Sequence, residues 1–243
     1  MTETEAVSKP LSEFSRLSGV FFNPMQAFRD IAARPKWFVP AILIVVANLV
    51  LVFLISQHIG FDRIVQKSID ESPRAASMSA EQRDQAVQMG EKIGPVMGYA
   101  VPPVLIPASM LTVGVVLMMI VNAMFSTQVQ FAQMVAIGAY AFLVQVVVII
   151  MTTIVLFLKP PDDFDVRNPL AFNLGAFLPD ATPKWLLSLA TSMDLFTFWT
   201  IALLATGIVV VTRKRQWGKA LFAVVAPWLL IVVLKAGWAA LFG

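Results

Sequence analysis

Residues 37–57 read WFVPAILIVVANLVLVFLISQ, an uncharged run in which nearly every side chain is apolar. A helix that spans a bilayer needs about 20 consecutive, mostly apolar residues, and this run meets that length. Its apolar residues do not alternate with polar ones, as the strands of a membrane β-barrel would require. Backbone groups in lipid must be paired within the segment, which a helix achieves. The run therefore predicts a transmembrane helix.

Four further apolar runs follow it. Of the 243 residues, 58% are hydrophobic and 14% charged, against about 45–50% and about 25% in soluble domains. The predicted fold class is all-α: an integral membrane bundle of five transmembrane helices with a short N-terminal interfacial amphipathic helix. The predicted spans are residues 37–57, 96–122, 131–158, 195–212 and 218–242.

The residues ahead of the first span, FFNPMQAFRDIAARPKWFVP (21–40), predict a short amphipathic helix. Asn23 is a helix-capping residue type, and Pro24 is favourable at the first helical position. At helical spacing one face carries Phe21, Met25, Phe28 and Ala32, and the other carries Gln26, Arg29, Asp30 and Ala33. Such a helix lies in the plane of the membrane interface.

This helix is expected to end at Arg34, because the residue before a proline, here Pro35, avoids α geometry. Trp37 then anchors the first span at headgroup level, and Pro40 falls in the first turn of that span. Residues 21–40 are therefore interpreted as an elbow: a surface helix, a break and a descent into lipid. The alternative is a disordered tail that ends in a span. Residues 1–20 are expected to be a flexible cytoplasmic tail.

The second predicted span begins GYAVPPVLIPASM and contains Pro102, Pro103 and Pro107. Prolines in a helix interior break or kink it. Either the helix starts near Pro102, so that the prolines cap it, or it starts earlier and is irregular at membrane depth. Irregular backbone is tolerated in a membrane only where protein or a water-filled cavity covers it, and such breaks can mark a substrate site in transporters.

Few polar side chains fall inside the spans. Asn122 and Gln145 are expected to form hydrogen bonds between helices. Lys235 is the only charge deep in a run, and it either snorkels to the interface or marks an intramembrane path. These three residues are the candidate intramembrane polar site. No carboxylate lies within a span to pair with the lysine.

No catalytic or cofactor motif is evident. There is no cysteine and a single histidine, His58, which excludes thiolate chemistry and the usual zinc sites. The chain contains no Walker motif, GxGxxG or GxSxG. We therefore expect no cofactor, no metal, no nucleic-acid partner and no enzymatic activity.

The basic residues predict an orientation. The stretch RKRQWGK (213–219) holds four basic residues, and Arg29, Arg34 and Lys36 precede the first span. Basic residues in short loops stay in the cytoplasm, and with five spans both segments fall on one side. We expect a cytoplasmic N-terminus and an external C-terminus. The basic stretch either binds anionic lipid headgroups or serves only as a topology signal.

Three segments in order resemble bacterial members of the Yip domain family. They are LSGVFFNPMQAFRDIAARPKWFVP (17–40), QFAQMVAIGAYAFLVQ (130–145) and MDLFTFWTIALLATGI (193–208). The positions that match family patterns, Pro24, Phe28, Pro35, Trp37, Pro40, Asp194 and Trp199, are expected to be structural. The chain departs from the family at MFSTQVQF (124–131), where members often carry glycines.

The resemblance implies a single five-span membrane domain over residues 21–243, with a cytoplasmic N-terminus and a location in the bacterial cytoplasmic membrane. Eukaryotic relatives are associated with Rab-type GTPases, vesicle budding and membrane shaping, whereas bacterial relatives largely lack an assigned function. The resemblance brings no catalytic residues.

The leading hypothesis is a non-catalytic integral membrane protein that contacts partner proteins or lipids in membrane organisation or trafficking-like roles. Membrane lipids are the expected partners, protein partners are unidentified, and self-association is left open. The alternative is a small-solute transporter or channel that uses the proline-broken second span and Lys235.

Overall fold

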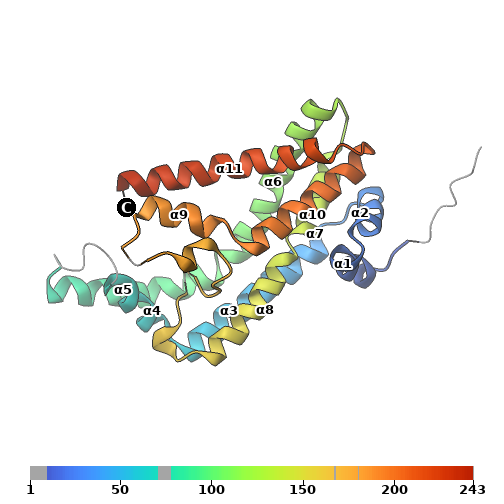
Figure 1. Cartoon of the computed structure of the whole chain (residues 1–243). Coiled ribbons are helices and arrows are strands. Elements are labelled where there is room, and N and C mark those ends of the chain that lie inside the picture. Colours follow the sequence, from blue (N-terminus) through green and yellow to red (C-terminus); the bar gives the residue numbers. More distant parts are fainter. Residues whose placement is uncertain (1–9, 71–77, 167, 180, 243) are drawn as a thin grey trace, which may run out of the picture. The chain divides into compact units, whose positions relative to one another are not determined.

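The computed structural model describes residues 10–70, 78–166, 168–179 and 181–242. The chain is helical in these residues, apart from turns and an isolated antiparallel bridge between Asn173 and Asp194. Figure 1 shows the helices in chain order. Their bounds are α1 (Glu13–Phe22), α2 (Pro24–Ala33), α3 (Phe38–His58), α4 (Phe61–Asp70), α5 (Ala80–Tyr99), α6 (Pro102–Phe125), α7 (Phe131–Ala141), α8 (Val144–Leu158), α9 (Lys184–Ser192), α10 (Leu195–Thr212) and α11 (Trp217–Phe242), with 3-10 helices η2 (Pro161–Asp163) and η3 (Leu174–Phe177).

Five segments of the described chain are long and apolar enough to cross a membrane: α3, α6, α7 with α8, α10 and α11. The bounds of α3, α10 and α11 agree with the predicted spans to within one residue. The all-α fold with five membrane-spanning segments is confirmed, because the length and apolarity of a segment can be read directly from the chain.

The second span starts later than predicted. Residues 96–99 belong to α5, and α6 begins at Pro102. Of the two alternatives, the structure therefore has the prolines at the start of the helix. Pro102 and Pro103 occupy its first turn, where a missing N–H removes no intrahelical bond, and only Pro107 lies inside. Val101 is non-helical, as expected for the residue before a proline.

The third span is not one uninterrupted helix. It divides at Phe142 and Leu143 into α7 and α8. The Leu143 N–H donates to the Tyr140 carbonyl at 3.2 Å, a tightened i→i−3 turn, while the Phe142 N–H donates to Gly138 at 2.9 Å. No proline or charged residue signals this interruption, so the sequence pattern alone missed it.

The N-terminal segment is more ordered than expected. Residues 1–9 of the predicted flexible tail lie outside the described residues, but residues 13–20 are helical. The Ser12 hydroxyl accepts a hydrogen bond from the Ser15 N–H at 3.1 Å and caps α1. Because Arg16 and Val20 are buried and α1 packs against α2 and α7, this part of the predicted tail belongs to the folded structure.

The chain divides into two compact units. Unit 1 takes in the described residues up to Pro40, with Met110–Leu143 and Thr197–Leu234. Unit 2 takes in Ala41–Ser109, Val144–Phe196 and the described residues from Lys235 onward. Unit 1 thus gathers the N-terminal helices, the α6–α7 turn and the α10–α11 loop, and unit 2 gathers α4, α5 and α9.

In unit 2, α4 packs against α5. A capping box begins α5: the Ser79 hydroxyl accepts from the Gln82 N–H at 3.2 Å, and the Gln82 side chain accepts from the Ser79 N–H at 2.9 Å. Neither α4 nor α5 has a buried residue, so this pair of helices has no core of its own.

Candidate functional site

A cluster of charged side chains in unit 1 centres on Asp30 of α2. Arg16 Nε donates to Asp30 Oδ2 at 2.6 Å, and the Arg34 guanidinium pairs with Oδ1 of the same carboxylate. Oδ1 also accepts from the Leu11 N–H at 3.2 Å. The Asp30 carboxylate thereby joins α1 and the residue stretch just before it to α2.

The cluster extends to α7 through α1. Glu13 Oε1 accepts from Arg16 Nη1 at 3.0 Å, and Glu13 Oε2 accepts from the Tyr140 hydroxyl at 2.8 Å. We call Glu13, Arg16, Asp30, Arg34 and Tyr140 the ion network. Its two acidic and two basic side chains balance in charge, and Tyr140 adds a neutral donor from the predicted third span.

Most of the ion network is inaccessible to solvent. The side chains of Arg16 and Asp30 are 4% and 8% exposed, and Tyr140 is fully buried. Desolvated charges are costly, and removing one partner of a buried pair typically costs about 3–5 kcal/mol. The ion network therefore holds α1 and α2 in one arrangement, since sliding either helix would leave a buried charge unpaired.

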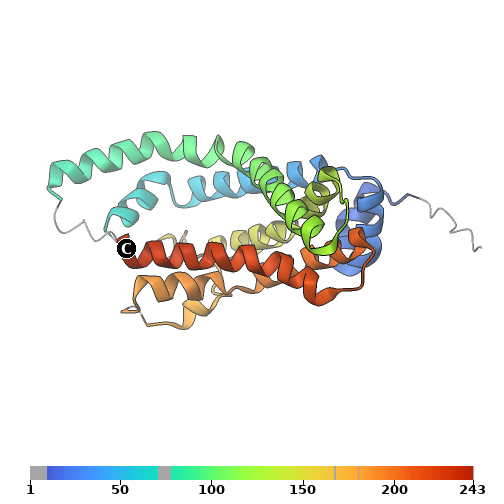
Figure 2. The same ribbon diagram turned by 90° about the horizontal axis from the view of Figure 1, so that it is seen from above.

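The elbow is built differently from the expected surface helix. Asp30, which we predicted on the polar face of α2, is buried, and so are Phe28 and Ile31. These residues are covered because α2 packs against α1 and α7, as Figures 1 and 2 both show. A hydrogen bond of 2.9 Å from Gln133 Nε2 to the Ala32 carbonyl holds the end of α2 to the start of α7. The apolar face is thus covered by protein, and the interfacial location of α2 stays a prediction.

The other elbow residues follow the predicted backbone path. Pro24 begins α2, and α2 ends at Ala33, just before Arg34 and Pro35. Asn23 precedes the helix without a side-chain cap bond, and its amide donates to the Gln26 side chain at 2.9 Å instead. In the next segment Trp37 stacks on Phe38 with ring centroids 4.2 Å apart, and Pro40 is buried in the first turn of α3.

Helix α7 is buried on all sides from Met134 to Ala141. Two glycines let its neighbours approach closely. A Cβ built on Gly114 of α6 would lie 2.5 Å from a Val135 methyl, and one on Gly207 of α10 would lie 2.3 Å from an Ile137 methyl. Small residues that allow close helix packing are typical of membrane proteins. Unit 1 is therefore organised around α7.

The α6–α7 turn, residues 126–130, is formed without a glycine. Ser126 adopts the left-handed conformation, with φ of 48°. The Asn122 side chain closes the turn, because Oδ1 accepts from the Val129 N–H at 2.7 Å and Nδ2 donates to the Val129 carbonyl at 3.1 Å. Lys214 of the α10–α11 loop donates to the Phe125 carbonyl. Asn122 is thus engaged in a turn within unit 1.

The other two members of the candidate intramembrane polar site have exposed side chains, Gln145 on α8 and Lys235 on α11. An exposed lysine stem on a spanning helix fits snorkelling toward the interface.

Two of the residues expected to be structural have clear local contacts. Asp194 Oδ1 accepts a hydrogen bond from the Phe196 N–H at 2.9 Å at the start of α10. Trp199 packs edge-to-face against Phe21, with ring centroids 5.6 Å apart.

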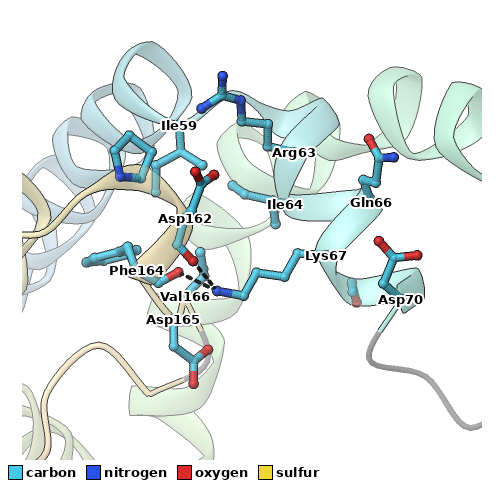
Figure 3. A pocket seen from close by; sticks show the side chains of 12 residues that line it. Ile59, Arg63, Ile64, Gln66, Lys67, Asp70, Asp162, Phe164, Asp165 and Val166 are labelled. Atoms are coloured by element: carbon cyan, nitrogen blue, oxygen red, sulfur yellow. Dashed lines mark hydrogen bonds between the residues drawn. The ribbon is translucent and has the colours of Figure 1, made fainter.

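Unit 2 holds a pocket that the sequence did not indicate. It has a volume of about 540 Å³ and lies between α4 and residues 161–166. Figure 3 shows Lys67 reaching across it, where Nζ donates to the carbonyls of Asp162 at 2.9 Å and Phe164 at 3.4 Å. Apolar side chains such as Ile64 and Phe164 also line it. Arg63, Asp162 and Asp165 are exposed, so the lining combines an apolar surface with solvent-exposed groups of both charges.

No group of three or more His, Cys, Asp or Glu side chains within the described residues is placed to hold a metal ion. The pocket in unit 2 offers charged and amide groups that could contact a small polar molecule. In the ion network, by contrast, each charged side chain is paired within the network and the central Arg16 and Asp30 are buried, so its role is structural.

Sequence inspection missed the ion network, although signals for it are present. Glu13 and Arg16 lie three residues apart, and Asp30 and Arg34 lie four apart, spacings that place side chains together on a helix. A tyrosine inside an apolar run, as at Tyr140, usually has a hydrogen-bond partner when it is buried. Which partner it has could not be read from the chain, because 127 residues separate Glu13 and Tyr140.

Comparison with protein families gives one match. The family model described as the Yip1 domain matches residues 18–237, which include the first four spanning segments and most of the fifth. No curated protein and no solved structure matches the chain.

Proposed function

The chain belongs to the Yip1 domain family, and from this premise we propose that it is a non-catalytic protein of the bacterial cytoplasmic membrane that works through contacts with lipids or partner proteins in membrane organisation. It is an integral membrane protein with five apolar spanning segments. In the proposed orientation the N-terminus is cytoplasmic and the C-terminus external, and residues 21–243 act as one membrane domain.

The observation that carries this proposal is the fastening of α1 and α2 onto α7 by the ion network. Well-packed apolar residues would often give equal stability, whereas paired buried charges can specify one arrangement. Here the pairing joins Arg16 to Asp30 and Glu13 to Tyr140. Two short helices held in one arrangement at the start of a spanning bundle form a defined contact surface, which suits a role in interaction.

The basic residues support the proposed orientation. Arg29 and Lys36 in the N-terminal segment, and Arg213, Arg215 and Lys219 around the α10–α11 loop, all belong to unit 1 and are exposed. Because basic residues close to spans stay on the cytoplasmic side, both segments support a cytoplasmic N-terminus.

Orientation is tested with epitope tags at both ends and protease added to inverted membrane vesicles. The N-terminal tag should be digested, and the C-terminal tag should be protected until detergent is added. Protection of the N-terminal tag together with digestion of the C-terminal tag would reverse the assignment.

The absence of transport is tested with purified protein in sealed liposomes, using panels of labelled ions, sugars and amino acids. Uptake should equal that of protein-free liposomes. Saturable uptake of any solute would overturn the proposal, and its loss in Lys235→Leu, with retention in a matched Gln145→Leu variant, would favour a transporter that uses Lys235.

A further inference from the structure

The acidic residues that the structure describes in unit 1 are both paired inside the unit. Among its described residues, eight are Lys or Arg and two are Asp or Glu, a net charge of +6. The two acidic residues are Glu13 and Asp30, and both belong to the ion network. Basic side chains outside the network therefore have no other carboxylate among the described residues of this unit to pair with.

Five of these basic side chains are exposed, and none forms an ion pair within the described part of the chain. We call them the basic face; they are Arg29, Lys36, Arg213, Arg215 and Lys219. Lys214 is excluded, because it donates to the Phe125 carbonyl. The basic face is thus a concentration of positive charge without an ion-pair partner among the described residues of its own unit.

Hydrogen bonds bring the two halves of the basic face to the same end of unit 1. Gln133 ties the start of α7 to the end of α2, just before Lys36. Asn122 at the end of α6 accepts a hydrogen bond from the Val129 N–H. Lys214 of the α10–α11 loop donates a hydrogen bond to the Phe125 carbonyl. Figures 1 and 2 agree in placing α2 and the α10–α11 loop at one end of this unit.

Helix α1 adds exposed aromatic side chains to this unit. Phe14 and Phe22 are 79% and 88% exposed, whereas Arg16 and Val20 on the opposite side of the helix are buried. At 100° per residue, the two phenylalanines fall on the face turned away from the ion network. An exposed apolar face on a helix with charged neighbours is typical of segments that lie in a membrane interface.

Two tryptophans indicate the depth of this end of unit 1. Trp37 directly precedes α3, and Trp217 is the first residue of α11. Tryptophan is enriched at headgroup level, and both residues stand where an apolar span begins. The nearest surface of complementary charge is therefore the headgroup layer of the membrane that these spans cross.

We propose that the basic face binds acidic phospholipid headgroups of the surrounding bilayer, and that Phe14 and Phe22 insert among the lipids beside them. This inference rests on the proposed lipid-contacting role and deepens it by naming the lipid class. The ion network contributes in two ways: it pairs both described carboxylates of the unit with arginines, burying that of Asp30, and it holds α1 with the phenylalanines turned outward.

The lipid preference is tested with the full chain in nanodiscs, where both leaflets are accessible and insertion topology does not matter. The probes are spin-labelled phosphatidylglycerol and spin-labelled phosphatidylcholine, and the measurement is the fraction of each that is motionally restricted by the protein. Wild type should prefer phosphatidylglycerol, and added NaCl should weaken the preference because salt screens exposed charges.

The variant Arg29→Gln/Arg215→Gln/Lys219→Gln should lose the preference, with each residue contributing up to about fivefold. The matched control is Lys92→Gln/Lys159→Gln/Lys184→Gln, three exposed lysines of unit 2, which should keep it. Equal binding of the two lipids by wild type, or equal losses in the two variants, would overturn the proposal. The orientation and uptake results would stand in either case, so this inference can fail while the proposed function holds.

Insertion of α1 is tested with a single fluorescent label, which is direct because the chain contains no cysteine. Phe22→Cys carrying an environment-sensitive fluorophore should emit at shorter wavelength in phosphatidylglycerol nanodiscs than the same label at Gln85→Cys, an exposed position of α5. The same label on Phe14→Cys provides a second position. Water-like emission at both phenylalanine positions would overturn the insertion of α1.

Discussion

Units 1 and 2 carry almost the same number of basic residues but very different numbers of acidic ones. Among the described residues, unit 1 has eight basic and two acidic side chains, and unit 2 has seven basic and nine acidic, so the net charges are +6 and −2. The contrast between the units therefore comes from the acidic residues. A topology rule that counts only Lys and Arg does not detect this contrast.

The units also differ in how deeply their ion-paired acidic side chains are buried. In unit 1, Asp30 is buried between two arginines. In unit 2, the ion pair between Arg83 and Asp70 spans 3.3 Å, with side chains 41% and 54% exposed. Buried pairs are costly to break, whereas exposed pairs contribute about 0–1 kcal/mol. Arginine–aspartate pairs thus hold helices together in the interior of unit 1, whereas the pair in unit 2 lies on the surface.

The largest effect is expected for Asp30→Asn. This change removes the buried charge that faces Arg16 and leaves the buried guanidinium with only the partly exposed Glu13 as an acidic partner. The free energy that holds α1 and α2 in place should fall by about 3–5 kcal/mol. Hydrogen exchange of the amides of α1 and α2 measures this as faster opening of these helices.

The matched control is Asp70→Asn in unit 2, which should change the protection of α4 by about 1 kcal/mol or less. Similar losses in the two variants would show that the contrast in burial between the units does not determine the strength of these pairs.

An intermediate effect is expected for Gly114→Ala. The new Cβ would meet a Val135 methyl at 2.5 Å and backbone atoms of Val135 at 3.1 Å, so α6 and α7 must move apart. Overpacking of this kind typically costs about 1–3 kcal/mol. Thermal unfolding in detergent should show a lower midpoint.

Gly237→Ala serves as the control, because no heavy atom lies within 4 Å of a Cβ at that position in α11. It should raise stability by up to about 1 kcal/mol, through the better helix propensity of alanine. A midpoint for Gly114→Ala at or above wild type would contradict the close packing of α6 on α7.

The smallest effect is expected for Tyr140→Phe. It removes the 2.8 Å hydrogen bond to Glu13, but Glu13 keeps its contact with Arg16 and is 39% exposed, so water can replace the lost donor. The loss should be about 1 kcal/mol, measured as faster exchange at the amides of α1.

Tyr99→Phe is the natural comparison, because the chain has only two tyrosines. The Tyr99 hydroxyl contacts the part-buried Ser56 hydroxyl of unit 2 at 3.0 Å. Its loss should leave the exchange of α1 unchanged. A response of α1 to Tyr99→Phe as large as that to Tyr140→Phe would refute a specific role for the ion network.

The spans and the two ends of α2 were predictable because their signals are local. A run of about 20 apolar residues must be helical in lipid, and Pro24 and Pro35 mark the two ends of α2 through their own backbone geometry. The start of α6 was missed by six residues, because the apolar character of residues 96–99 continues a helix that precedes the proline break.

The amino-acid sequence by itself determined how many segments of this protein can cross a membrane and where its backbone breaks, since apolar length and proline chemistry act over a few neighbouring residues. Only the tertiary structure decided that Asp30 is buried, that α7 is enclosed, and that Glu13 meets Tyr140. These outcomes depend on which helix faces pack together, and contacts between residues more than a hundred positions apart leave no local periodicity in the chain.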